Sequence, residues 1–256
     1  MRPKGVIIAS VAATILSFGS LSALPVPAQN ARAATPVASA SPGPAPSPAS
    51  AEPGPSVPIA TAAPIAQRLA FVEHAAFFSL EAKQSMLVDP QVFVAVAGAP
   101  VVPKGLQGIA HIAGVRNAMM VDDPERSVLS GVGKPLGFTL ARWFAAAGTV
   151  DLAPQADGTE RIAMHFTHLI PNGRYSLFEN HFDTTPVTFT PLDGAGTANG
   201  FIASKEGSAE LVVTAAAVLT HQNAVLAVYH SDGIEHGQSR GEIGVVAHHQ
   251  LIARIP

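Results

Sequence analysis

The sequence predicts a mainly β protein whose folded part is an antiparallel β-sandwich, and two observations predict it. From residue 137 onward, short runs of apolar or alternating residues follow one another along the chain, as strands of a sandwich or barrel do. Turn signals such as Asn172-Gly173 and Asp232-Gly233 separate these runs, because Gly and Asn adopt a positive φ at little cost. The runs occupy residues 138–146, 148–152, 161–169, 175–179, 187–189, 200–203, 209–214, 224–230 and 241–255.

The chain begins with the three parts of a secretory signal peptide, which we place at residues 1–33. Arg2 and Lys4 supply positive charge, an apolar run follows over residues 5–23, and small residues flank two candidate cleavage points. An uncleaved membrane anchor is the alternative, but several serines make the apolar run a weak span. We therefore expect an exported protein, periplasmic, cell-surface or extracellular, with no transmembrane span after signal cleavage.

A linker and an N-terminal segment precede the predicted sandwich. Residues 34–64 are rich in Pro, Ala and Ser, and such a composition buries too little apolar surface to offset its conformational entropy, so we expect a disordered stalk. Residues 65–135 show helical spacing at first and a strand-like run later. We expect them to form a helix plus irregular or strand elements packed on a sandwich of residues 136–256.

Composition excludes several functional classes. A net charge of −3 gives no basic surface for nucleic acid, so we expect no nucleic-acid partner. The chain has no Cys, which removes disulfides, thiolate nucleophiles and sulfur-ligated metals. No phosphate-binding loop, dinucleotide fingerprint or nucleophile elbow is present either. An exported domain of this kind is stable through packing alone, or with a metal held by His and carboxylates.

Histidine is the chemically active residue type that is unusually dense. Eight of the ten histidines follow residue 164, and neutral imidazole is a common ligand of copper and zinc. His230 and His236 flank a glycine-containing loop, so the two rings could converge on one ion. A strand histidine more often has a core or surface role than a ligand role, and this alternative applies to each one singly. The candidate metal ligands are His181, His230, His236 and His249.

Three further residues are candidates for supporting roles. Asp183 follows His181, and Asp232 follows His230, at a spacing of two that places each pair on one side of an extended chain. These carboxylates could orient the rings or add oxygen ligands. Arg240 could steer an anion into a cleft, and a salt bridge to a nearby glutamate, Glu235 or Glu242, is the alternative.

Residues 169–183, LIPNGRYSLFENHFD, resemble the Leu-x-Pro-Gly-x-His-Gly-Phe-His-x-His-x-x-Gly-Asp stretch of Cu/Zn superoxide dismutases and of the related chordin-type secreted domains. Residues 200–210 are similar to the family's strand, acidic turn and Gly-x-Ala strand. Residues 227–230, AVYH, resemble its Val-Val-His motif, whose histidine binds copper. The resemblance covers roughly residues 148–229 and implies a Greek-key β-sandwich in which His230 would be a ligand.

The chain departs from the family's pattern at most other ligands. The two copper-binding histidines of the family fall at or near Phe178 and Asn180, and His181 is one place out of register, which turns a strand side chain to the other face. The zinc-binding loop corresponds to residues 184–197, which hold no His. The resemblance therefore implies that the standard site is lost or rebuilt.

Two functions from different classes follow. The first is an exported superoxide-dismutase-like domain that binds copper or zinc through a rebuilt histidine site, with standard dismutase activity doubtful because most ligands are missing. The second is a non-catalytic binding or structural module, displayed on the Pro-rich stalk, with an envelope or cell-wall partner. The sequence does not establish an enzymatic activity or an oligomeric state.

Overall fold

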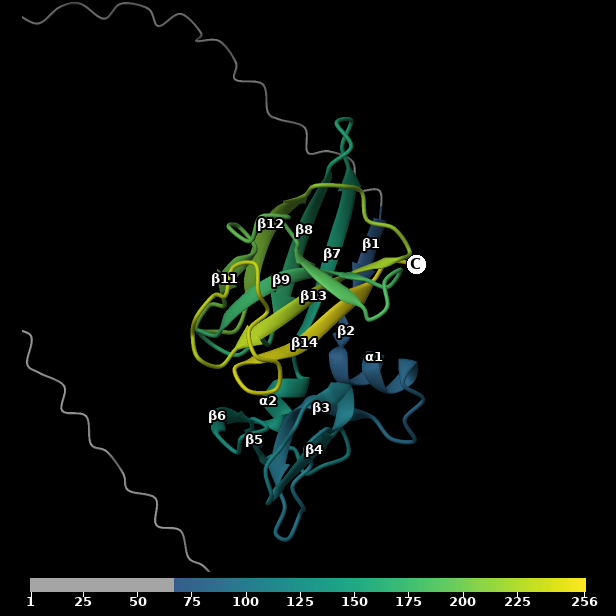
Figure 1. Cartoon of the computed structure of the whole chain (residues 1–256). Coiled ribbons are helices and arrows are strands. Elements are labelled where there is room, and N and C mark those ends of the chain that lie inside the picture. The colour runs from purple at the N-terminus through teal and green to yellow at the C-terminus, as the bar shows by residue number, and fades with distance from the viewer. Residues whose placement is uncertain (1–66) are drawn as a thin grey trace, which may run out of the picture. The chain divides into compact units, whose positions relative to one another are not determined.

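The structure is a computed structural model that describes residues 67–256, which form two larger antiparallel sheets and a third, smaller one (Figure 1). The predicted mainly β class with antiparallel sheets is confirmed. The predicted signal peptide and linker lie outside the described residues. Within the described part of the chain, no helix has the length and apolar composition needed to cross a membrane. The Greek-key connection and the family resemblance stay predictions.

The two larger sheets contain most of the strands predicted after residue 137. The first sheet has the order β1-β7-β8-β12, with strands β1 (Gln67–Ala70), β7 (Ala147–Pro154), β8 (Glu160–Thr167) and β12 (Ala209–Ala215). The second has the order β10-β9-β13-β14-β2, and β11 pairs with another part of β9. Its strands are β10 (Thr188–Pro191), β9 (Arg174–His181), β13 (Asn223–His230), β14 (Ala247–Arg254), β2 (Val72–Glu73) and β11 (Gly200–Ile202).

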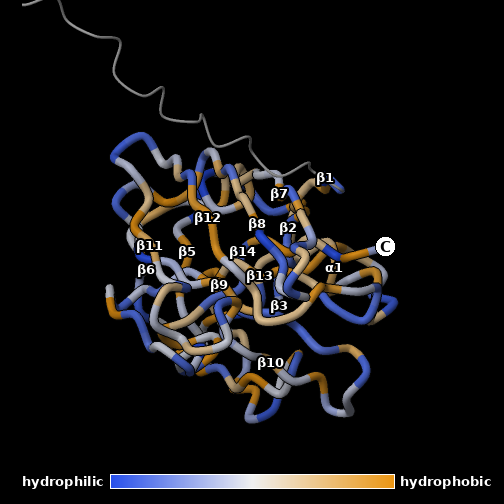
Figure 2. Tube along the Cα trace, turned by 90° about the horizontal axis from the view of Figure 1, so that it is seen from above, coloured by the Kyte–Doolittle hydropathy of each residue, from blue (hydrophilic) through white to orange (hydrophobic). Residues whose placement is uncertain are grey.

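The main hydrophobic core lies between these two sheets. Residues of β7 and β8 such as Val150 and Phe166 belong to one buried cluster with residues of β9 and β13 such as Leu177 and Ala227. Figure 2 shows hydrophobic stretches along several strands, whereas the loops mix hydrophilic and hydrophobic stretches. This is the pattern of a sandwich whose inner faces exclude water.

The outer face of the second sheet is buried as well. Strand β13 is buried at every position, because its outward side chains, among them Leu226 and Val228, form a second core with Phe178. Phe77 of helix α1 (His74–Glu81) packs against this second core from outside. A continuous apolar run is typical of a strand covered on both faces, and His230 stands at the end of this run.

The smaller sheet lies in the segment predicted to be a helix plus irregular or strand elements. Its order is β4-β3-β5-β6, and its strands are β3 (Val88–Ala95), β4 (Val115–Met119), β5 (Ser127–Leu129) and β6 (Pro135–Thr139). A 3₁₀ turn, η1 (Leu106–Gly108), precedes β4, and a short helix, α2 (Leu140–Phe144), follows β6. The smaller sheet and α2 therefore extend past residue 136, the predicted start of the sandwich, and residues 140–144 of the predicted strand-like run 138–146 form a helix instead.

Buried polar side chains join the smaller sheet to the sandwich. The side-chain oxygen of Gln91, in β3, accepts a hydrogen bond from the backbone N–H of His249 at 2.7 Å. Trp143 donates from Nε1 to Asp89 Oδ2 at 2.9 Å, and its carbonyl accepts from Gln250 Nε2 at 2.8 Å. Because a buried polar group without a partner is costly, these bonds fix how the smaller sheet packs on β14.

Candidate metal centre

His230 is the most deeply buried side chain of the candidate centre. It ends β13 on the outer face of the second sheet and is 1% exposed. Its Nε2 lies 2.5 Å from Ser176 Oγ on the neighbouring strand β9. Its Nδ1 is buried and has no hydrogen-bond partner among the described residues. One ring nitrogen is thus satisfied by the sheet, and the other is free for a ligand.

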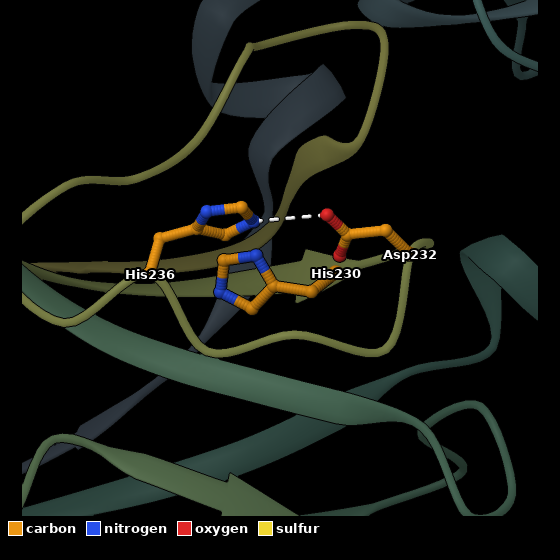
Figure 3. Close-up of side chains that lie close together, drawn as sticks. All are labelled: His230, Asp232 and His236. Atoms are coloured by element: carbon orange, nitrogen blue, oxygen red, sulfur yellow. Dashed lines mark hydrogen bonds and ion pairs between the residues drawn. The ribbon is translucent and has the colours of Figure 1, made fainter. Parts of the chain in front are cut away.

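Asp232 and His236 lie on the loop that leaves β13. Asp232 Oδ1 accepts the backbone N–H of Ile234 at 3.1 Å, an Asx turn that turns the chain back toward the sheet. Asp232 Oδ2 lies 3.1 Å from His236 Nε2, and the His230 and His236 ring centroids are 5.1 Å apart (Figure 3). The loop therefore places a carboxylate and a second imidazole beside the free nitrogen of His230.

The three side chains offer ligand atoms that all lie within 4.8 Å of one another. Two nitrogens bound to one tetrahedral zinc ion at about 2.05 Å would be about 3.3 Å apart, so the cluster must contract to bind an ion. The side chains that can move to bring the ligand atoms closer are those on the loop, since His236 is 25% exposed and Asp232 is 21% exposed. Their exposure also leaves a side of the cluster open to solvent and to a further ligand.

Burial sets the protonation state of His230. Burial and, to a smaller extent, the neighbouring His236 together lower the pKa of His230 to about 4, and the Asp232 carboxylate only partly opposes this shift. A neutral imidazole is the form that binds a metal. The nearby Arg174 guanidinium is paired with the Glu235 carboxylate, and the Asp232 carboxylate is left to face the cluster. The local charge therefore suits a cation.

A second loop supports the Asp232–His236 loop. Asp193 accepts the backbone N–H groups of Gly196, Thr197 and Ala198 at 2.7–2.9 Å, which closes a tight turn. A Cβ at Gly196 would lie 2.7 Å from the backbone of Gly237, so only glycine lets the two loops approach this closely. The loop at residues 184–197 therefore serves as a support for the candidate centre.

His181 and Asp183 lie apart from this cluster, so the structure does not bring the candidate ligand His181 together with His230. His181 pairs with Asn223 at one end of β13, whereas Arg174 pairs with His230 at the other end. Seven residues at about 3.3 Å each separate the two ends by roughly 23 Å. His181 contacts Thr190 and Asn223 instead, and Asp183 is exposed.

His249 lies on the same outer face as His230 but points to other partners. Its Nδ1 is 3.4 Å from His74 Nε2, and its Nε2 is 3.0 Å from Arg240 Nη1. His249 is therefore absent from the group of potential metal ligands found in residues 67–256. His74, at the start of α1, was not singled out from the sequence because helical spacing alone gives no sign of its partner in β14, 175 residues away.

Arg240 does not form the salt bridge to Glu235 or Glu242 that was the alternative to an anion-steering role. In the described part of the chain Glu235 pairs with Arg174, and no carboxylate lies within ion-pair distance of Arg240. Its guanidinium instead lies over the Phe189 ring, 3.2 Å from the centroid. Burial lowers the pKa of Arg240 to about 10. The arginine is thus a cation balanced by an aromatic face and a neutral imidazole alone.

Comparison of the chain with protein-family models, with curated proteins and with solved structures finds no match. Any chemical role of the cluster is therefore argued from the arrangement of His230, Asp232 and His236. Two imidazoles, one carboxylate and an open side form a ligand set that could hold a metal ion.

Proposed function

We propose that this chain is an exported β-sandwich protein that binds one zinc or copper ion through His230, Asp232 and His236. The observation that carries the proposal is the unpartnered, buried Nδ1 of His230 beside the other two side chains (Figure 3). A buried polar atom without a partner costs about 1–3 kcal/mol. A metal ion at this point would give that atom a partner.

The ligand set fits the two metals that the sequence suggested. Zinc sites with three protein ligands and one open position commonly use two His and one carboxylate, and Cu(II) also accepts nitrogen and oxygen ligands. Binding would replace the proton shared by Asp232 and His236, because ligands bind in their deprotonated form. Ser176 would then accept the Nε2–H of His230 and hold its ring in place. A bound ion would supply Lewis-acid chemistry at the open side.

Standard superoxide dismutase activity is not part of the proposal. The resemblance to Cu/Zn superoxide dismutases supports the sandwich and the ligand role of His230, whereas a cycling copper ion is held by several imidazoles. The alternative function is a non-catalytic envelope or cell-wall module on the Pro-rich stalk. The stalk, and the family ligands missing near Phe178, Asn180 and in residues 184–197, favour this alternative.

Metal content tests the proposal. The purified protein is dialysed against zinc or copper, then against metal-free buffer, and the metal is counted by mass spectrometry. We expect about one equivalent for the wild type and about one tenth or less for His230→Ala. His165→Ala is the matched control, because His165 is exposed and pairs only with Glu210. A wild type without metal, or a His230→Ala variant that keeps it, contradicts the proposal and favours the module.

A pair of glycine variants tests the position of His236. Gly241 and Gly233 both have positive φ, at +81° and +72°, so an alanine at either position costs about 1 kcal/mol in backbone strain. A Cβ at Gly241 would lie 3.0–3.1 Å from the His236 ring, whereas at Gly233 no atom lies within 4 Å. We expect Gly241→Ala to weaken zinc affinity by about tenfold or more, and Gly233→Ala to leave it unchanged. Equal affinities, measured by competition with a chromogenic chelator, would contradict the placement of His236.

A further inference from the structure

A cavity separate from the candidate metal centre lies on the outer face of the same sheet, around Arg240. It has a volume of about 250 Å³ and is partly enclosed. Phe77, Phe182 and Phe189 contribute apolar surface, and Asn180 contributes a polar group from β9. None of the proposed metal ligands lines it. The cavity thus combines apolar walls with a few polar groups, as small-molecule sites do.

Arg240 gives this cavity an uncompensated positive charge. No carboxylate of the described residues lies within ion-pair distance of it, and the Phe189 ring holds the guanidinium in place at 3.2 Å. A planar guanidinium matches a carboxylate through two parallel hydrogen bonds. Only one of its nitrogens is occupied, by His249. The remaining donors suit an anionic group of a ligand.

A chain of hydrogen bonds runs from Arg240 through His249 to His74, and it leaves one buried N–H donor without a partner in the part of the chain that the structure describes. Arg240 can only donate, so His249 accepts at Nε2 and carries its proton on Nδ1. His249 Nδ1 then donates to His74 Nε2 at 3.4 Å, which places the proton of neutral His74 on its Nδ1. That Nδ1 is buried and has no partner within residues 67–256. His74 is 4% exposed and lines the cavity.

Asn180 leaves a free acceptor in the same cavity. Its Oδ1 is buried and unpartnered in the described structure, and the residue is 4% exposed. Two orphaned polar groups, each more than nine-tenths buried, are therefore found among the residues that line one small cavity. Each costs free energy as long as nothing binds it. Their presence beside an uncompensated arginine indicates a ligand with a matching pattern.

We propose that this cavity binds a small aromatic or similarly apolar carboxylic acid that also carries a hydroxyl or N–H group. The carboxylate would bind Arg240 and accept from His74, the apolar body would pack on Phe77, Phe182 and Phe189, and the donor would reach Asn180. The volume limits the size, since about 250 Å³ equals roughly eight waters at about 30 Å³ each. A single ring with two substituents fits this space.

Calorimetric titration of the purified protein with 4-hydroxyphenylacetate tests the proposal. All measurements use a His230→Ala background, so that a carboxylate bound to metal is not mistaken for one bound to Arg240. We expect a Kd on the order of 0.1 mM, as suits a ligand of this size. Because that background lacks the proposed metal site, failure here and failure of the proposed function are separate results.

Two variants and one matched control assign the contacts. Arg240→Gln is expected to weaken binding of 4-hydroxyphenylacetate at least tenfold and to leave the weak binding of its neutral amide unchanged. Arg254→Gln is the control, because Arg254 also stacks on a ring, that of Phe182, at 3.7 Å but does not line the cavity. Asn180→Leu removes the orphaned acceptor without emptying the space, and should reduce binding to the level of phenylacetate, which lacks the hydroxyl.

Tenfold loss in Arg240→Gln with normal binding in Arg254→Gln supports the proposal. Absence of binding at millimolar 4-hydroxyphenylacetate, or equal affinity in Arg240→Gln and in the unsubstituted background, overturns it. If Arg240→Gln fails to fold, the selectivity of Asn180→Leu between the two acids still decides, and unchanged selectivity overturns the proposal.

Discussion

Replacement of Trp143 by alanine is expected to lower the free energy of unfolding by about 5 kcal/mol. Trp143 is 2% exposed. Its ring stacks on that of Phe138, with the ring centroids 5.7 Å apart, and makes a T-shaped contact with the ring of Tyr229. Loss of its volume costs about 3–5 kcal/mol. Loss of its Nε1–H leaves the buried Asp89 carboxylate one hydrogen bond short, which adds about 1–3 kcal/mol. Because whole domains are stable by only about 5–15 kcal/mol, this variant should be close to unfolded.

Urea denaturation followed by far-UV circular dichroism measures this effect, because the backbone signal does not depend on the tryptophan that the variant removes. Trp143→Phe is the matched variant, since it keeps an aromatic ring and removes only the donor to Asp89 and part of the volume. We expect it to lose roughly half as much stability as Trp143→Ala. A loss below about 2 kcal/mol for the alanine variant would show that the smaller sheet is not held to the sandwich through Trp143.

The protein is also expected to unfold in mild acid, because four histidines are buried in their neutral form. Burial lowers the pKa of His74 to about 3 and those of His230 and His248 to about 4, and it lowers the pKa of His249 well below its usual value. In the unfolded chain each takes a proton near pH 6.5. As the pH falls from 6.5 toward 4, the unfolded state binds protons that the folded state does not, so stability falls.

The expected loss is several kcal/mol between pH 7 and pH 5. A histidine with a folded pKa of about 4 and an unfolded pKa of about 6.5 loses roughly 2 kcal/mol at pH 5. Asp89 acts in the opposite sense: burial raises its pKa to about 6, so the folded state binds its proton first as the pH falls. The four histidines outweigh Asp89. We expect maximal stability near pH 7 and unfolding between about pH 4 and 5.

Denaturation curves at pH 7, 6 and 5 check this expectation. His74→Phe should reduce the pH dependence by about one proton, whereas His165→Ala should not change it, because His165 is exposed. The slope is the readout, so a change in absolute stability does not obscure the result. Equal stability at pH 7 and pH 5 would show that these imidazoles are not buried as described.

The sequence predicted the sandwich because its strands follow a local rule. Strand β13 appears as an apolar run, and turns such as Asn172-Gly173 carry residues that tolerate positive φ. The smaller sheet was harder to predict because β5 has three residues, and β6 contains both Pro135 and Gly137. Strands this short take their stability from neighbours that are distant in sequence.

Part of the candidate centre could also be predicted, because its residues are close together in the sequence. His230, Asp232 and His236 lie within seven residues, so a turn signal and spacing could bring them together. His181 was a candidate ligand as well, but its position depends on strand register. The register pairs His181 with Asn223, at the end of β13 opposite to His230. The contact between His74 and His249 joins residues 175 positions apart, and no local pattern indicates such a pair.

Anomalous diffraction from crystals grown with one equivalent of zinc or copper is the most direct test of the metal proposal. Data collected on both sides of the metal's absorption edge locate the ion independently of any assumption about its ligands. We expect one peak, about 2.1 Å from His230 Nδ1 and bound by Asp232 and His236. The absence of a peak at this cluster, or an ion bound only elsewhere, such as at His181, would contradict the proposed centre.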